Sequence, residues 1–168
     1  AQGLDELPGR SNYFIGDEPA QWRAGIPSYA RVRYRNIYPG VDVVFRSVQG
    51  ELEYDLELAP GADPGRIRLA VEGVDRVRVD AAGDLVFEIG RDVLRQRKPL
   101  VFQEAAGGRR ILQARYVLRG ERSVGFEVAG RNPGQRLTID PVLVYSTYLG
   151  GSNADYAKGI AVDAQGSA

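Results

Sequence analysis

Apolar and polar side chains alternate along most of this chain, in runs of roughly five to eight residues. A period of two predicts strands, because successive side chains of a strand point to opposite faces of its sheet. Glycine, proline, aspartate and asparagine separate the runs, as is typical of turns between short strands. No long amphipathic helix is indicated. The predicted strands are residues 30–38, 41–47, 51–58, 67–71, 76–79, 85–89, 93–97, 100–103, 110–119, 123–129 and 137–144.

This pattern predicts an all-β fold, an antiparallel β-sandwich-like domain of about ten to eleven short strands. Glycine supplies the positive φ angle that tight hairpins need. Strands that are neighbours along the chain are therefore expected to pair, while the strand order across layers stays open. The glycine-containing turns are residues 47–50, 80–84, 105–108 and 119–121.

Two turns contain proline, at residues 38–40 and 59–65. They are expected to interrupt the sheet, because proline has no amide hydrogen to donate to a strand ladder. The second turn is predicted to cross between layers. Alternatively, a short helical turn could begin there, since Asp63 is a good N-cap and Pro64 suits the first helical position.

The residues from Tyr145 onward are rich in small side chains, with evenly spaced glycines and aspartates. This texture is typical of one unit of a propeller or solenoid. We therefore predict a β-rich domain over residues 1–143 and the beginning of a propeller-type repeat over residues 144–168. An incomplete repeat cannot bury its own apolar face. Ile160 and Val162 are thus expected to pack onto the preceding domain or to stay poorly ordered.

The composition narrows the chemistry. The chain has 168 residues with neither cysteine nor histidine, so thiol nucleophiles, Ser-His-Asp triads and histidine-ligated zinc are excluded within it. Its 22 basic and 22 acidic residues balance, which disfavours nucleic acid as a partner. No apolar run approaches the roughly 18 residues of a spanning helix, so membrane insertion is not expected. The chain starts without methionine or a signal-peptide layout, which suggests an excerpt of a longer protein.

Several motifs occur in order along the chain. They are residues 11–16 (SNYFIG), 38–42 (YPGVD), 52–55 (LEYD), 59–64 (APGADP) and 140–151 (DPVLVYSTYLGG). Together with Trp22 in the segment PAQWR, they resemble the N-terminal domain of bacterial SBBP-repeat proteins. The resemblance covers nearly the whole chain.

The resemblance implies a β-rich domain of unknown function that precedes several propeller-type repeats in a large exported or surface-attached bacterial protein. It implies no enzymatic activity. It places the chain outside the cell or on the cell surface. Family members also continue upstream of the region that matches Ala1, which predicts an exposed strand edge near residues 12–16.

Four acidic residues, Glu51, Glu53, Asp55 and Glu57, alternate with apolar ones and share one strand face. Neighbouring carboxylates on such a face stand roughly 6 to 7 Å apart, a separation that a carboxylate-pair glycosidase could use. Such catalysis needs one carboxyl kept protonated by burial, whereas a row of acids is typical of a solvated face. The solvated face is the favoured interpretation, with a hydrolase centred on Glu53 and Asp55 as the alternative.

Arg31, Arg33 and Arg35 form a similar basic stripe. Cross-strand pairing with the acidic face is the simplest interpretation, and each exposed pair would contribute at most about 1 kcal/mol. A nucleic-acid surface is the alternative, which the balanced charge disfavours.

Aromatic side chains gather in the first forty residues. They are core material or a platform for stacking against sugar rings, because tyrosine and tryptophan are common at interfaces. Tyr34 beside Val32 suits a core. Trp22, Tyr13 and Tyr29 are the candidate ligand-binding residues. The whole set is Tyr13, Phe14, Trp22, Tyr29, Tyr34 and Tyr38.

Asn153, Asp155 and Asp163 offer oxygen ligands near glycine turns, but their spacing matches no EF-hand loop. Side-chain bonds to the backbone of turns explain them as well. We therefore assign no metal site, no cofactor and no catalytic residue.

The leading hypothesis is a non-catalytic structural or adhesion module, whose partners are the downstream propeller repeats and an extracellular polysaccharide or cell-surface protein. A carbohydrate-binding module is the alternative, and a carboxylate-pair glycoside hydrolase is the third. The inward-facing residues are predicted to be Val32, Tyr34, Leu52, Tyr54, Leu56, Val117, Phe126 and Val128.

Overall fold

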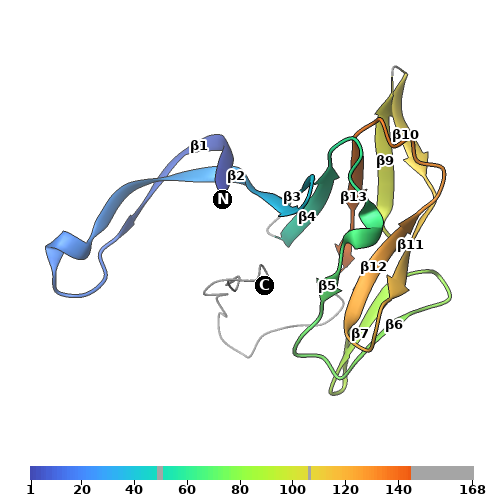
Figure 1. Ribbon diagram of the computed structural model, residues 1–168. Helices are drawn as coiled ribbons and strands as arrows, with labels where there is room; N and C mark the ends of the chain where they lie inside the picture. Colours follow the sequence, from blue (N-terminus) through green and yellow to red (C-terminus); the bar gives the residue numbers. More distant parts are fainter. Residues whose placement is uncertain (49–50, 106, 145–168) are drawn as a thin grey trace.

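The computed structural model describes residues 1–48, 51–105 and 107–144. This part of the chain is all-β, with antiparallel pairing throughout, as the alternation of side chains predicts. Within it, the helical elements are two short 3-10 turns, η1 (Pro19–Gln21) and η2 (Pro64–Arg66). The strands form three sheets, and a long hairpin projects from one of them (Figure 1).

The largest sheet has seven strands in the order β1-β2-β3-β4-β13-β9-β10. Its first four strands form a meander, and β13 then inserts between β4 and β9, so two of its neighbours are distant in sequence. The strands are β1 (Gln2–Tyr13), β2 (Arg23–Tyr38), β3 (Val41–Val48), β4 (Glu51–Leu58), β13 (Leu137–Asp140), β9 (Leu100–Ala105) and β10 (Gly108–Leu112).

The two smaller sheets also combine hairpins with distant strands. A three-stranded sheet has the order β11-β12-β5, and a four-stranded sheet has the order β14-β8-β7-β6. The first contains β11 (Ala114–Leu118), β12 (Ser123–Val128) and β5 (Leu69–Ala70). The second contains β14 (Leu143–Val144), β8 (Asp92–Gln96), β7 (Leu85–Ile89) and β6 (Arg76–Val79).

One hydrophobic core joins all three sheets. Each sheet contributes the apolar face of its alternating strands, and burial of these faces is the main force that holds the sheets together. Its buried members are Val41, Val43, Leu56, Leu58, Ile67, Val74, Val77, Leu85, Phe87, Val101, Leu112, Tyr116, Val124, Phe126, Leu137 and Ile139.

Two predicted strands are in fact two strands each. The predicted strand 110–119 breaks at Gln113, where the chain leaves the seven-stranded sheet and enters the three-stranded one. The predicted strand 137–144 breaks at Pro141, where the chain passes to the four-stranded sheet. Proline cannot continue a ladder, which explains the second break. Nothing in the local pattern marks the first, because Gln113 is not a turn-forming residue.

Two side chains that were predicted to face the core, Leu52 and Val117, are not buried in it. Leu52 is 50% exposed although it lies on the same face of β4 as buried Leu56. It lies near the start of β4, whereas β13 pairs with this strand only from Leu56 to Leu58. In β11, Tyr116 is buried and Val117 is only half-buried, so this strand faces the core with the opposite set of side chains. Phe126 is fully buried, as predicted. Tyr34, Tyr54 and Val128 are partly buried and pack against the core.

The short helical turn that was the alternative for the second proline-containing turn is present. Asp63 caps η2 by accepting a hydrogen bond from the amide of Gly65 at 3.0 Å, and Pro64 occupies the first turn. The segment therefore satisfies its own backbone groups while it connects the large sheet to the small ones.

Candidate functional site

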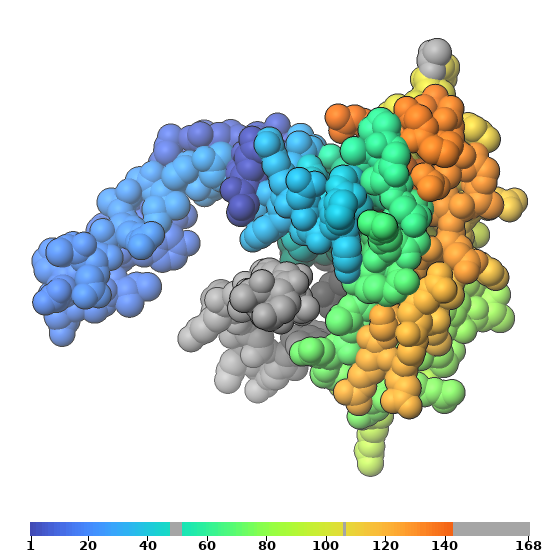
Figure 2. All heavy atoms as spheres, in the orientation of Figure 1, coloured from blue at the N-terminus to red at the C-terminus, as the bar shows by residue number. Residues whose placement is uncertain are grey.

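The first thirty residues form a two-stranded arm that stands away from the body of the domain (Figure 2). The sequence pattern missed β1 entirely, and β2 begins well before its predicted start at residue 30. Only the second half of β2 pairs with β3, from Arg31 to Tyr38. None of residues 1–30, all of which the structure describes, is buried. The arm is thus an extension with no core of its own.

Polar contacts across the two strands hold the arm together. The Asn12 side-chain oxygen accepts a hydrogen bond from the amide of Gly25 at 2.7 Å. Arg31 forms an ion pair with Asp5 at 2.6 Å, and the pairing register shifts on either side of Ser11. A two-stranded ribbon is marginally stable in water. These contacts are exposed, so each adds little to the stability of the arm.

The arm tip, residues 13–22, carries a cluster of exposed apolar side chains. Phe14 and Trp22 pack edge to face, with ring centroids 5.3 Å apart. The indole nitrogen of Trp22 donates a hydrogen bond to the carbonyl of Gly16 at 3.1 Å, which fixes the ring orientation. Trp22 is nevertheless 42% exposed, Phe14 61% and Ile15 74%. The tip therefore presents an ordered apolar surface to solvent.

The structure separates the three candidate ligand-binding residues into two places. Tyr13 ends β1 opposite Arg23 and so lies at the arm tip beside Trp22. Tyr29 pairs with Glu6 instead, roughly 20 Å further along the ribbon. There its ring covers Gly3, where any side chain would collide with it. At the tip, Trp22 thus packs against Phe14, while Tyr29 lies elsewhere on the ribbon.

The remaining early aromatic residues are structural. Tyr34 packs against the core and meets Phe45 edge to face at 5.9 Å. The Tyr38 hydroxyl donates a hydrogen bond to the carbonyl of Arg68 at 2.9 Å, which ties the end of β2 to the segment after η2. These two side chains are core material, one of the two interpretations that the sequence left open.

Two acids of the stripe on β4, Glu53 and Asp55, converge on a single arginine. Arg46 of β3 forms ion pairs with Asp55, with Glu53 at 3.0 Å and with Asp140 of β13 at 3.4 Å. Burial raises the pKa of Asp55 to about 6, although the nearby Arg46 charge acts in the opposite direction. The guanidinium occupies the space between Glu53 and Asp55, where a glycosidase would need to place the sugar. The geometry therefore favours an ionic network rather than a catalytic pair.

Of the basic stripe on β2, Arg33 pairs with the acidic face across the sheet, as predicted. Arg31 pairs instead with Asp5 of β1, and Arg35 donates a hydrogen bond to the side chain of Gln2. Arg33 reaches across β3 to Glu57 at 2.8 Å and also approaches Asp42 at 3.7 Å. Val44 of β3 lies between β2 and β4, on the same face of the sheet as Arg33, and is only 1% exposed. Long arginine side chains can cover apolar surface in this way while their charged ends remain paired. These arginines are engaged by partners within the sheet.

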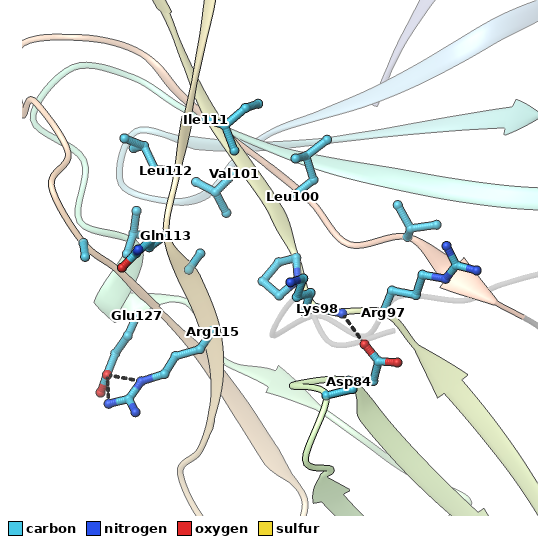
Figure 3. Close-up of a pocket in the computed structure, with 16 residues that line it drawn as sticks. Asp84, Arg97, Lys98, Leu100, Val101, Ile111, Leu112, Gln113, Arg115 and Glu127 are labelled. Atoms are coloured by element: carbon cyan, nitrogen blue, oxygen red, sulfur yellow. Dashed lines mark hydrogen bonds and ion pairs between the residues drawn. The ribbon is translucent and has the colours of Figure 1, made fainter.

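A broad groove of about 1160 Å³ lies where the chain switches sheets at Gln113. Leu100 and Ile111 line its apolar part (Figure 3), and Pro99 belongs to the same lining. Arg97 and Lys98, in the connection from β8 to β9, lie at one side of the groove together with Asp84 (Figure 3). No sequence pattern indicated this groove, because its lining comes from segments that are far apart along the chain.

The ion pair of Arg115 with Glu127, at 2.5 Å, lies on the opposite side of the groove (Figure 3). The backbone amide of Lys98 donates a hydrogen bond to the Asp84 carboxylate at 2.9 Å, which fixes the backbone there. The side-chain ammonium of Lys98 forms no ion pair with a described residue. The groove is open and has no convergent catalytic set. It can hold an apolar segment that carries negative charge.

The described residues contain no group of three acidic side chains placed to hold a metal ion. Asn153, Asp155 and Asp163 lie outside the described residues, as do Ile160 and Val162. No helix among residues 1–48, 51–105 and 107–144 has the length and apolar character to cross a bilayer.

Comparison with known families gives two matches. A model described as a domain of unknown function (DUF7948) matches residues 1–142, and a β-propeller repeat model (SBBP) matches residues 144–168. The predicted resemblance to the N-terminal domain of SBBP-repeat proteins is therefore confirmed. No curated protein and no solved structure matches the chain.

Proposed function

The chain belongs to the DUF7948 family and ends in a β-propeller repeat, and we propose that it is a non-catalytic adhesion module of an exported bacterial surface protein. In this proposal the body positions the arm, and the arm tip makes contact with a partner outside the cell. The repeat makes the protein β-propeller-related, and further repeats downstream would continue the array.

The exposed arm tip is the observation that carries this proposal. Large apolar side chains that are both ordered and exposed mark interaction surfaces more often than they mark chance features. Phe14, Ile15 and Trp22 gather at the end of a ribbon that has no buried residue. Apart from the contact between Phe14 and Trp22, nothing in the described ribbon covers these side chains. A partner that covers them would stabilise the arm.

The non-catalytic part of the proposal is supported by the state of the acidic residues. Glu53 and Asp55 share one guanidinium, and Asp140 contacts the same group. A general acid or nucleophile must be free to reach its substrate. Without histidine or cysteine, these carboxylates are the main catalytic candidates in the chain, and their ion pairs hold them on a sheet face.

Bead adhesion tests the proposal. Beads coated with the 168-residue chain are expected to adhere to intact bacterial cells or to surface-protein layers. The triple variant Phe14→Ser, Ile15→Ser, Trp22→Ser should lose most of this adhesion, because it removes the apolar tip. A matched control replaces two exposed apolar residues of the body, Ile89→Ser and Leu118→Ser, and should adhere like the wild type. Equal adhesion of both variants would contradict the proposal.

The cellular location needs a separate measurement. In cells that produce the whole parent protein, an antibody against the domain should label the intact surface, and external protease should remove the signal. Labelling that appears only after the cells are broken would contradict an exported module.

A carbohydrate-binding module is the second candidate, favoured by the fixed and exposed indole ring of Trp22. Tryptophan rings in such a setting stack well against sugar rings. Binding to a polysaccharide array that is lost in Trp22→Ala would support this function over a protein partner. Treatment of the target cells with periodate, which destroys sugars, should then abolish bead adhesion, whereas treatment with protease should not.

A further inference from the structure

We propose that the arm tip of one copy of this chain docks into the groove of a second copy, so that the domains associate head to tail. The inference rests on the proposed function in one respect, that the arm is the binding element. It adds the chemistry of a partner, namely the surface of another copy. Three features of the described residues support it.

The first feature is the composition of the arm tip. Beside the exposed rings of Phe14 and Trp22, the turn carries two acids, Asp17 and Glu18. Among the described residues, no ion pair reaches either of them, and Glu18 only accepts a hydrogen bond from the side chain of Gln21. The tip is thus an apolar knob with an unpaired negative charge.

The second feature is the complementary composition of the groove. Its apolar part exposes Ile111 to 58% and Leu100 to 41%. In the part of the chain that the structure describes, the side chains of Arg97 and Lys98 have no ionic partner. Within the described chain, the lining also contains one acid without an ion pair, Asp84, so the unpaired charge of the groove is positive on balance. The groove therefore combines open apolar surface with an excess of positive charge, and its volume of about 1160 Å³ can admit several side chains. Complementary charge of this kind steers association and fixes register.

The third feature is the place of the two surfaces in the sheet. The arm grows from β1 and β2 at one edge of the seven-stranded sheet, and β10 forms the other edge (Figure 1). Ile111 and Leu112 of β10 line the groove. Five strand spacings separate β2 from β10, about 24 Å. The arm also projects away from the body, so its tip does not reach the groove of its own chain. A second copy must supply the groove, and such a contact joins unlike surfaces and leads to rings or open chains.

Charge reversal gives a direct test by sedimentation equilibrium of the 168-residue chain. The wild type is expected to show an average mass that rises with concentration. A tip variant, Asp17→Lys with Glu18→Lys, and a groove variant, Arg97→Glu with Lys98→Glu, should each associate at least about tenfold more weakly, because like charges then face each other. An equimolar mixture of the two variants should recover association, since each tip then meets a groove of opposite charge.

A matched control separates the contact from net charge. Arg122→Glu with Arg136→Glu changes the net charge as much as the groove variant does, at exposed sites away from the groove. This control should associate like the wild type at the same salt concentration. Circular dichroism of every variant confirms that the strands are retained, so that weak association is not a consequence of unfolding.

Three outcomes would overturn the inference: a wild type that stays monomeric at all concentrations, association that ignores both charge reversals, and a mixture that fails to recover. The groove variant also separates this inference from the proposed function, because its arm tip is intact. If it associates normally while the apolar tip variant loses bead adhesion, the self-association is wrong and the adhesion module stands. If adhesion is insensitive to the tip while the charge-reversal mixture recovers association, the adhesion proposal fails and the self-association stands.

Discussion

The arm and the body are built from the same kind of hairpin, yet they differ in what lies behind their strands. In the body, the hairpin of β3 and β4 lays Val43 and Leu56 against two further sheets, and both side chains are buried. In the arm, the hairpin of β1 and β2 has no layer behind it, and none of residues 1–30 is buried.

The difference shows which forces specify each region. The body is stabilised by removal of apolar surface from water, at roughly 25 cal/mol per Å². The arm is held by its ladder and by exposed polar pairs, each of which contributes about 1 kcal/mol or less. The body therefore supplies most of the folding free energy. The arm contributes little to it and can expose apolar side chains to a partner.

The same substitution in the two regions should give the largest contrast. Phe126 is 1% exposed in the core, so Phe126→Ala is expected to lower the free energy of unfolding by about 3 to 5 kcal/mol. Phe14→Ala at the arm tip should change it by less than about 0.5 kcal/mol. Urea unfolding followed by tyrosine fluorescence measures both. Equal losses would mean that the arm packs on the body in solution.

Polar contacts provide the next contrast. Gln103 is buried and its amide joins β9 to the loop before β13, donating to the Asn132 carbonyl at 2.9 Å and accepting from the Asn132 amide at 2.8 Å. Gln103→Leu leaves these backbone groups unpaired and should cost about 2 to 3 kcal/mol. Asn12→Ala removes a similar contact in the exposed arm, where water replaces it, and should cost less than about 1 kcal/mol.

The control for this pair is Gln113→Leu, at an exposed position of the body. It should leave the unfolding midpoint close to that of the wild type. A large loss in Asn12→Ala would show that the arm contributes to the cooperative unit of the fold.

Acid titration should give the smallest effect. The folded-state pKa of Asp55 is about 6, above its usual value of 3.8, so the folded protein holds this proton more tightly than the unfolded chain does. The stabilisation is fully present below about pH 4 and is lost as the pH rises toward 6, by roughly 1 kcal/mol for a partly exposed group. Asp55→Asn should flatten this segment of the stability curve.

Urea midpoints at several pH values between about 4 and 7 measure the effect. Glu104→Gln, at an exposed acid of β9, should retain the decline of the wild type. A decline that survives in Asp55→Asn would show that Asp55 is not its source.

Most strands of the body could be predicted from the sequence, because a strand with one buried face shows alternating apolar and polar residues. The strands around Val43, Leu56 and Phe126 show this alternation, and glycine turns separate them. The switch at Gln113 has no such signal, since a strand can change sheets without a turn-forming residue. The first strand of the arm was missed because it has no buried face. Residues 2–13 include Pro8 and Gly9 and bury nothing, so their strand is set by pairing with β2 rather than by a hydrophobic pattern.

The candidate site was only partly visible in the sequence. Trp22 and Tyr13 could be selected as aromatic residues, but Ile15 carries no such signal, and its role depends on the shape of the tip. The importance of Arg46 was also hidden, because Asp140 reaches it from a strand that is distant in sequence. Spacing along the sequence predicts which side chains of one strand share a face. It does not predict a contact with a strand that is inserted from elsewhere in the chain, because that contact depends on the sheet topology.

Because β2 belongs to both regions, it also sets how the domain carries mechanical load. A pull on the arm tip runs along β2 into its ladder with β3, from Arg31 to Tyr38. Antiparallel hydrogen bonds lie perpendicular to the strands, so a lengthwise pull shears the bonds of this ladder together instead of opening them one by one. Tension from a bound partner would thus be spread over the seven-stranded sheet, and the arm would act as a tether rather than a weak hinge.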